Sequence, residues 1–200
     1  MNTNDLVLAV LANEPKTKGH ILGRTLLQKK LFFLKELTSA QIRFLPHYYG
    51  PYSREIAETV DSLVSAGFII ERAESYPSMR TPWGETTRYS YELSSKVQDN
   101  IDKLLVERLG GKGYSKIQNS LKKINSLPES GDYKLLSLAA KVLQILNEKR
   151  QMRVNDFPRE ARKLNWDLRA EDVRKASVFL KNLGLLKEAK QNSKDTSPSR

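Results

Sequence analysis

The chain has 200 residues, of which 39% are hydrophobic and 28% charged, so it can bury a core and has neither a disordered nor a membrane-like composition. No apolar run approaches the roughly 20 residues of a membrane helix, and the first residues lack a signal-peptide pattern, so we expect a cytoplasmic protein. The absence of cysteine excludes disulfides and thiolate metal sites, and two histidines are too few for a histidine-rich metal cluster. We therefore expect no enzymatic activity and no cofactor.

The net charge of +11 points to a polyanionic partner such as nucleic acid. Residues 1–100 carry 12 lysines and arginines against 11 acidic residues, whereas residues 101–200 carry 22 against 12. Nearly the whole excess lies in the second half, which we expect to dominate any affinity for DNA. Charges this dense also occur on ordinary solvated surfaces, and both interpretations stay open.

Two helices are predicted near the N-terminus. The first is capped by Asn4 or Asp5 and ends before Pro15. After a polar connection over residues 16–23, apolar residues at helical spacing predict the second helix from Thr25 to Leu37, with Lys29 and Lys30 on its polar side.

A third helix and a β-hairpin complete the first half. Residues 41–47 are compatible with a strand, and a helix capped by Ser53 ends at Gly67. Residues 68–93 alternate in polarity around a tip rich in proline and glycine, which predicts a hairpin. Three helices followed by a hairpin is the order of a winged helix-turn-helix, which we predict for residues 1–95.

The second half is predicted to be helical. Gly110 to Gly113 are expected to form a flexible turn, because their pattern fits no phosphate-binding motif. Residues 128–131 are the expected domain linker. The helices are predicted at residues 94–109, 115–127, 133–147, 156–164 and 170–183.

The predicted domains are therefore a winged helix-turn-helix over residues 1–95, connecting helices over 96–128, a helical domain over 129–189 and a disordered tail over 190–200. Residues 63–71 and 180–188 share a leucine, a glycine, two apolar positions and a glutamate. This repeat indicates either a second winged-helix-like unit at 133–189 or merely two helices that end at a glycine.

The third helix is unlike a DNA-reading helix. A helix in the major groove needs basic or amide side chains on its outer face. Here the outward positions carry a net charge of −2, so the predicted DNA contacts lie elsewhere. These outward positions are Arg54, Glu55, Glu58, Asp61, Ser62 and Ser65.

The candidate nucleic-acid contacts are basic side chains on the second helix, the hairpin and the C-terminal half. The hairpin arginines flank Trp83 at the tip, a combination suited to a groove or a phosphate. Residues 47–52 are rich in aromatic side chains that suit base stacking or, alternatively, the packing of a tight turn. The candidate residues are Lys29, Lys30, Arg80, Arg88, Lys112, Lys116, Arg153, Arg169, Arg174 and Lys175.

Three short segments carry a resemblance to known families. They are Leu-Gln-Lys-Lys-Leu-Phe-Phe-Leu at 27–34, Tyr-Gly-Pro-Tyr-Ser at 49–53, and residues 63–71. Over residues 5–95 the chain resembles the YwgA-like family of small prokaryotic proteins and is similar to the Panacea domain of SocA-type antitoxins. The resemblance implies a winged-helix-like fold without enzymatic activity, and the Panacea domain also implies toxin neutralisation through protein contact.

Two functions are consistent with these features. The leading hypothesis is a prokaryotic or archaeal transcriptional regulator that binds double-stranded DNA through phosphate contacts, as a candidate homodimer. The alternative is an antitoxin or adaptor whose acidic third helix docks a protein partner.

Overall fold

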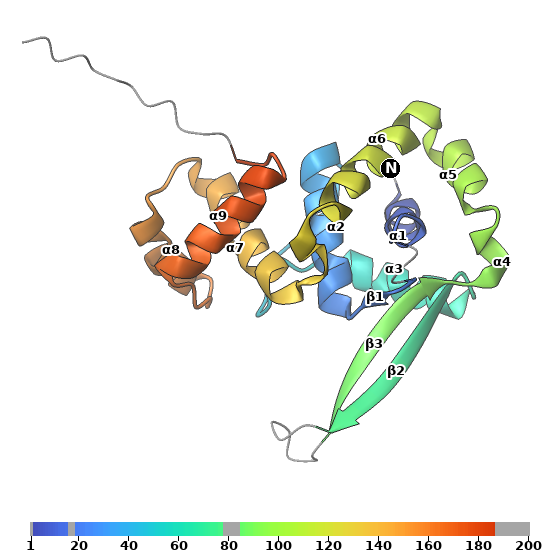
Figure 1. The fold of residues 1–200 in the computed structure, drawn as a ribbon, viewed down its shortest axis with the longest axis horizontal. Helices are drawn as coiled ribbons and strands as arrows, with labels where there is room; N and C mark the ends of the chain where they lie inside the picture. Colours follow the sequence, from blue (N-terminus) through green and yellow to red (C-terminus); the bar gives the residue numbers. More distant parts are fainter. Residues whose placement is uncertain (1, 16–18, 78–84, 187–200) are drawn as a thin grey trace, which may run out of the picture.

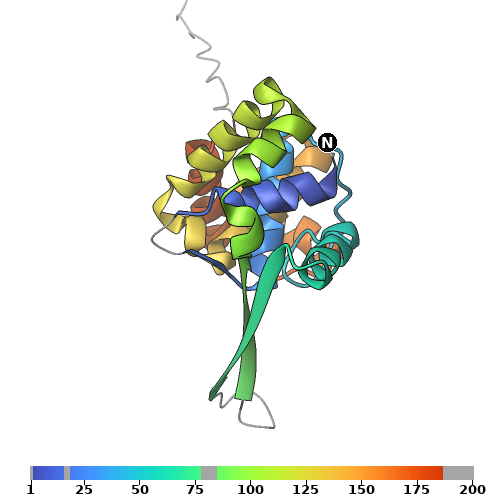
Figure 2. The same cartoon turned by 90° about the vertical axis from the view of Figure 1, so that its right-hand side faces the viewer.

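The protein is mainly helical with one small three-stranded antiparallel sheet, of which the sequence predicted the helical class and the two-stranded hairpin (Figure 1). The structure is a computed structural model that describes residues 2–15, 19–77 and 85–186. A long hairpin projects from one end of a body of helices (Figure 2).

Helices α1 (Thr3–Ala12) and α2 (Arg24–Thr38) lie close to their predicted positions. The side chain of Asn2 caps α1 by accepting a hydrogen bond from the backbone N–H of Asn4 at 3.1 Å, so the cap precedes the predicted candidates Asn4 and Asp5 by two and three residues. Helix α2 is central, since it packs against α1, α6 (Gly111–Asn125) and α7 (Tyr133–Lys149).

The prediction that Lys29 and Lys30 lie on an exposed side of α2 is wrong. Their exposed fractions are 2% and 1%, because neighbouring helices cover nearly the full circumference of α2. The spacing of apolar residues shows which side of a helix faces the core. It cannot show that other segments also cover the polar side.

Residues 40–52 cross from α2 to α3 (Arg54–Ser65). They form no strand, but Leu45 and Tyr52 make an isolated antiparallel bridge. Gly50 has a φ of +90° and lies so close to α7 that a Cβ atom there would approach the Ser137 carbonyl oxygen to 3.2 Å. This turn therefore joins α2 to α7.

Helix α3 has the predicted cap and end. The Ser53 hydroxyl accepts a hydrogen bond from the Ile56 N–H at 3.4 Å, and Gly67 leaves the helix with a φ of +73°. The chain then enters the predicted hairpin of β2 (Ile69–Pro77) and β3 (Glu85–Leu93).

The sheet has the strand order β1-β3-β2, with Ile69 opposite Leu93 in the hairpin. Strand β1 (Ile21–Leu22) pairs with the base of β3. The sequence did not predict this strand, because two residues are too few to show an alternating pattern. The predicted contact residue Arg80 and its neighbour Trp83 lie outside the described residues.

The single helix predicted over residues 94–109 is two helices, α4 (Ser95–Gln98) and α5 (Ile101–Leu109). The break predicted at residues 110–113 is confined to Gly110, which has a φ of +73°, and α6 begins at the next residue. Gly111 and Gly113 are therefore helical, and the predicted flexible turn is wrong.

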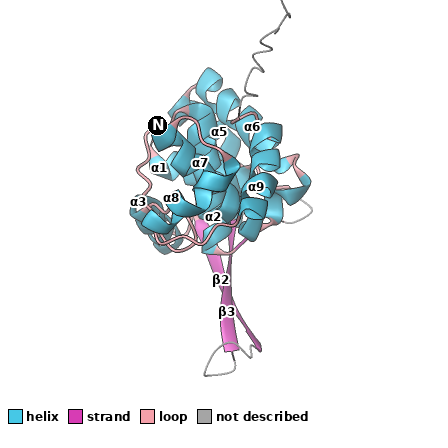
Figure 3. Cartoon of the chain, turned by 90° about the vertical axis from the view of Figure 1, so that its left-hand side faces the viewer, coloured by secondary structure: helices cyan, strands magenta, loops and turns pink. Residues whose placement is uncertain are grey.

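The C-terminal helices pack as a group beside α2 (Figure 3). A short 3-10 helix, η1 (Pro128–Gly131), leads into α7, and η2 (Val154–Asp156) leads into α8 (Phe157–Lys163) and α9 (Ala170–Asn182). The rings of Phe33 and Phe179 lie 5.4 Å apart between α2 and α9, so the hydrophobic core continues across the predicted linker. The predicted domain boundaries stay a prediction, and the predicted disordered tail lies outside the described residues.

The repeated glycines have the same local geometry. Gly67 and Gly184 both have a φ of +73°, and the next N–H in each case bonds back to the carbonyl of a residue five positions earlier. Leu185 and Leu186 form no strand. The repeat therefore reflects a shared helix-ending motif.

In the parts of the chain that the structure describes, every helix is too short or too polar to cross a membrane.

Candidate nucleic-acid interface

The two predicted contacts on α2 are structural residues. The Nζ of Lys29 donates a hydrogen bond to the Pro51 carbonyl oxygen at 2.6 Å. Burial, together with the charge of nearby Lys141, lowers the pKa of Lys29 to about 7. Lys29 therefore holds the 49–53 turn against α2.

Lys30 joins three segments that are distant in sequence. Its Nζ forms an ion pair with Glu14 and donates a hydrogen bond to Asn125 Oδ1 at 2.9 Å. The side chains of both ion-pair partners are at most 4% exposed. Because this charge is enclosed and paired, Lys30 offers nothing to an external phosphate.

A shallow, wide-open depression in the surface lies along α6 beside the C-terminal end of α2. We call it the basic groove. Among the described residues that line it, three are lysines and none is acidic, and the others are mostly small or polar. The lining residues are Leu37, Gly111, Lys112, Ser115, Lys116, Asn119, Ser120 and Lys123.

Helical spacing brings the three lysines together. Lys112, Lys116 and Lys123 are separated by four and seven residues, which places them on one face over about 16 Å of helix. Lys116 also donates a hydrogen bond to the Thr38 carbonyl oxygen at 3.0 Å, so it partly neutralises the end of α2. Two predicted contacts, Lys112 and Lys116, therefore share one site.

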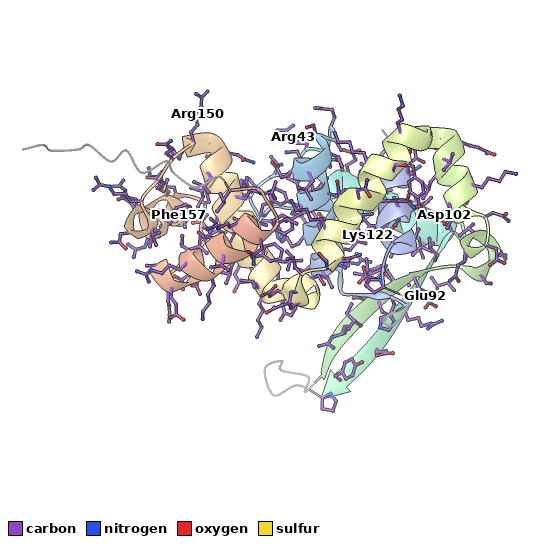
Figure 4. The ribbon with its side chains drawn as sticks, turned by 45° about the horizontal axis from the view of Figure 1, so that its top comes forward. Arg43, Glu92, Asp102, Lys122, Arg150 and Phe157 are labelled. Atoms are coloured by element: carbon purple, nitrogen blue, oxygen red, sulfur yellow. The ribbon has the colours of Figure 1, made fainter. Side chains whose placement is uncertain are left out.

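Lys123 extends this site toward α9 and was not among the predicted contacts. A Cβ atom at Gly184 would lie 2.5 Å from the Nζ of Lys123, so glycine permits this close approach. The spacing from Lys112 and Lys116 could have identified Lys123. Lys122 lies outside the basic groove and lines a separate hollow with Asn13 and Asn125 (Figure 4).

The C-terminal cations are dispersed, and several are engaged in ion pairs. Glu160 lies within 4.0 Å of Lys149, Arg159 and Lys163, and its hydrogen bonds from Lys163 lower its pKa. Lys175 pairs with Glu171 at 2.6 Å. The other three predicted contacts in this part are exposed, at Arg153, Arg169 and Arg174.

The outer face of α3 is acidic, as predicted. All six outward positions are exposed, and Glu58 pairs with Arg54 at 2.8 Å. Asp61 lies 3.5 Å from Arg24, which comes from α2. This face presents more negative than positive side chains and suits a basic partner better than a phosphate backbone.

The hairpin offers a further exposed cation. The guanidinium of Arg88 lies over the ring of Tyr76 at 5.4 Å. Arg72, on the neighbouring strand, forms an ion pair with Glu92.

No cluster of three or more potential ligands for a metal ion occurs among residues 2–15, 19–77 and 85–186. The fold and surface thus define a mainly helical protein with a small antiparallel sheet and a lysine-lined groove.

No family model matches the chain, but comparison with known proteins found a similar protein. The chain is similar to the "Uncharacterized protein YwgA" of Bacillus subtilis (strain 168), with 30% identity over 106 residues. The match covers 51% of this chain and 58% of that protein. This similarity supports the expected relation to a YwgA-like family, and the relation to the Panacea domain stays a prediction.

Proposed function

We propose that this protein binds double-stranded DNA as a non-enzymatic transcriptional regulator. The observation that carries the proposal is the basic groove, where Lys112, Lys116 and Lys123 share one face with no acidic lining residue among the described part of the chain. Phosphate backbones bind such surfaces by releasing condensed counterions.

The N-terminal part supports a winged-helix assignment. Its elements follow the order α1-β1-α2-α3-β2-β3, and α3 packs against β2 of the hairpin, which is compatible with a wing. In the proposed mechanism the acidic α3 does not read bases. The basic groove anchors phosphates, while Arg88 on the hairpin is the second contact.

The serine and asparagine side chains of the basic groove suit this role. Ser115 and Asn119 can donate hydrogen bonds to phosphate oxygens between the lysines, whereas the Ser120 hydroxyl already donates to the Lys116 carbonyl oxygen at 2.9 Å. Contacts of this kind position a duplex without reading its sequence, so base specificity must come from other contacts. A homodimer that contacts two half-sites would give the arrangement in which helix-turn-helix proteins usually read DNA.

A duplex titration over a range of salt concentrations tests the proposal. The double variant Lys112→Gln with Lys116→Gln should bind at least about tenfold more weakly and flatten the plot of log K against log salt by about 1.8. The matched control is Arg54→Gln with Arg159→Gln, which removes the same charge from two exposed arginines that form ion pairs. It should bind nearly as the natural chain does.

Absence of duplex binding at 50 mM salt would overturn the proposal. An equal loss in both double variants would also overturn it, because net charge and not the basic groove would then govern binding.

The acidic face of α3 favours a second candidate, an antitoxin or adaptor that captures a basic protein surface. Replacing Glu55, Glu58 and Asp61 with lysine should abolish partner capture under this hypothesis. Under the DNA-binding proposal the same triple variant should bind duplex equally well or more tightly. Pull-down from the host cell, with identification of both protein and DNA, separates the two functions.

A further inference from the structure

A second hollow, of about 360 Å³, lies where the middle and outer part of the hairpin meet the start of α2 and the first residue of α7. We call it the Tyr/Arg pocket. Its polar and aromatic lining comes from Arg24, Tyr76, Arg88, Tyr89 and Tyr133. Its volume lies in the range of small-molecule sites, roughly 300 to 1,000 Å³.

The wall nearest α2 is firmly held. The guanidinium of Arg24 lies 5.1 Å from the centre of the Tyr89 ring. Arg24 also donates hydrogen bonds to Tyr91 at 2.7 Å and to Glu71 at 3.0 Å. Because these partners hold its guanidinium, Arg24 orients the Tyr89 ring. A charged ligand must therefore pair with another residue.

Arg88 provides the charge that a ligand would need. Its guanidinium lies over the Tyr76 ring, and among the described residues no carboxylate forms an ion pair with it. Glu74 is opposite Arg88 in the strand register but accepts the Tyr76 hydroxyl hydrogen bond and does not line the pocket. An anionic group on the pocket side can therefore reach Arg88.

Tyr133 closes the pocket from the C-terminal half. Tyr133 is the first residue of α7 and is 42% exposed, and Tyr76 is 40% exposed. Aromatic rings that stay half exposed beside an arginine are the arrangement on which nucleobases stack.

We propose that the Tyr/Arg pocket binds a nucleotide, with the base stacked on a tyrosine ring and the phosphate paired with Arg88. Tyr76 and Tyr133 can offer ring faces to any base, whereas Tyr89 alternates to the opposite face of β3 from Arg88 and is covered by Arg24. A guanidinium binds phosphate through parallel N–H donors. The nucleotide is either free or part of an unpaired nucleic-acid strand. The site shares Arg88 with the proposed duplex contact but no residue with the basic groove. Loss of nucleotide binding in the Arg88 variant and loss of duplex binding in the Lys112→Gln, Lys116→Gln variant are therefore distinguishable.

Calorimetric titration of the full chain tests the pocket with three probes. Adenosine monophosphate should bind at least about tenfold more tightly than adenosine or inorganic phosphate, because it alone engages both the rings and the arginine. An eight-residue 5′-phosphorylated oligodeoxyadenylate distinguishes the sources. Tighter binding of the oligomer indicates a strand, and equal binding indicates a free nucleotide.

Variants connect the signal to this pocket. Arg88→Gln should weaken adenosine monophosphate binding about tenfold and leave adenosine unchanged, whereas Glu74→Gln should tighten it. Arg72→Gln is the matched control, since Arg72 lies on the same hairpin, is paired with Glu92 and does not line the pocket.

Tyr133→Phe should retain binding and Tyr133→Ala should lose it. Thermal unfolding of each variant identifies any that fail to fold. If Tyr133→Ala does not fold, Arg88→Gln carries the test, because Arg88 is exposed. No binding at millimolar adenosine monophosphate, or an equal loss in Arg72→Gln and Arg88→Gln, would overturn the proposal.

Discussion

Helices α2 and α6 each have 15 residues and each carry several lysines, yet they use them in opposite ways. On α2, Lys29 and Lys30 are buried and bound to partners from other segments. On α6, Lys112 and Lys116 are exposed and line the basic groove.

The difference teaches that a count of basic residues overstates the charge that is available for binding. Two of the twelve cations in the first half are enclosed by α1, α6 and α7. Enclosed charges stabilise the fold only through their partners and are costly when a partner is lost. Surface charges add little to stability and remain free to act on ligands.

The largest expected effect comes from Lys30→Met. This substitution leaves Glu14 buried without its cation, and such losses cost about 3 to 5 kcal/mol in the free energy of unfolding. Urea unfolding measures the change. The control Lys35→Met removes a more exposed pair with Glu36 and should cost less than about 1 kcal/mol. Equal costs would contradict the contrast between buried and exposed lysines.

Gly50→Ala tests the turn that covers Lys29. The added Cβ would lie 3.1 Å from Lys141 Cγ at a φ of +90°, so we expect a loss of about 2 to 3 kcal/mol. Gly67→Ala has a similar φ but meets nothing within 4 Å, so it should cost only about 1 kcal/mol. Chemical denaturation of both variants provides the measurement, and a smaller loss for Gly50→Ala would refute the close packing.

The lowered pKa of Lys29 predicts a pH dependence. Between about 7 and its ordinary value of 10.5, the unfolded chain binds more protons than the folded one, so the free energy of unfolding rises with pH in this window. From pH 7 to pH 9 the natural chain should gain about 2 kcal/mol relative to Lys29→Met. Unfolding curves at several pH values test this, and parallel profiles for the two proteins would disprove it.

The smallest effect is expected on α6. Lys112→Gln should change the free energy of unfolding by less than about 0.5 kcal/mol, because the side chain is exposed and forms no ion pair with another described residue. The same substitution should still weaken duplex binding if the basic groove anchors phosphates. A large loss of stability in thermal unfolding would remove the distinction between α6 and α2.

Much of the local structure could be predicted from the sequence because its causes are local. The cap at Ser53, the left-handed end at Gly67 and the hairpin after it depend on residues that are neighbours in the chain. The break between α4 and α5 was missed because the apolar residues stay near helical spacing across Asp99 and Asn100. The two-residue β1 was missed because pairing with β3, a long-range contact, creates it.

The candidate site was predicted only in part for the same reason. Lys112 and Lys116 were both predicted as contacts, but the sequence placed Lys112 in a turn before the helix. Because α6 begins at Gly111, the structure puts both lysines on one helical face. The Tyr/Arg pocket combines Arg24, Arg88 and Tyr133, which are separated by tens of residues and meet only in the folded chain.

The sequence by itself determined the helical class, the hairpin, most helix ends and the concentration of positive charge in the second half. Only the tertiary structure decided which lysines face the solvent, because Lys29 and Lys30 are buried by Pro51, Glu14 and Asn125. Burial depends on what packs over a helix, and those neighbours lie far away in the sequence.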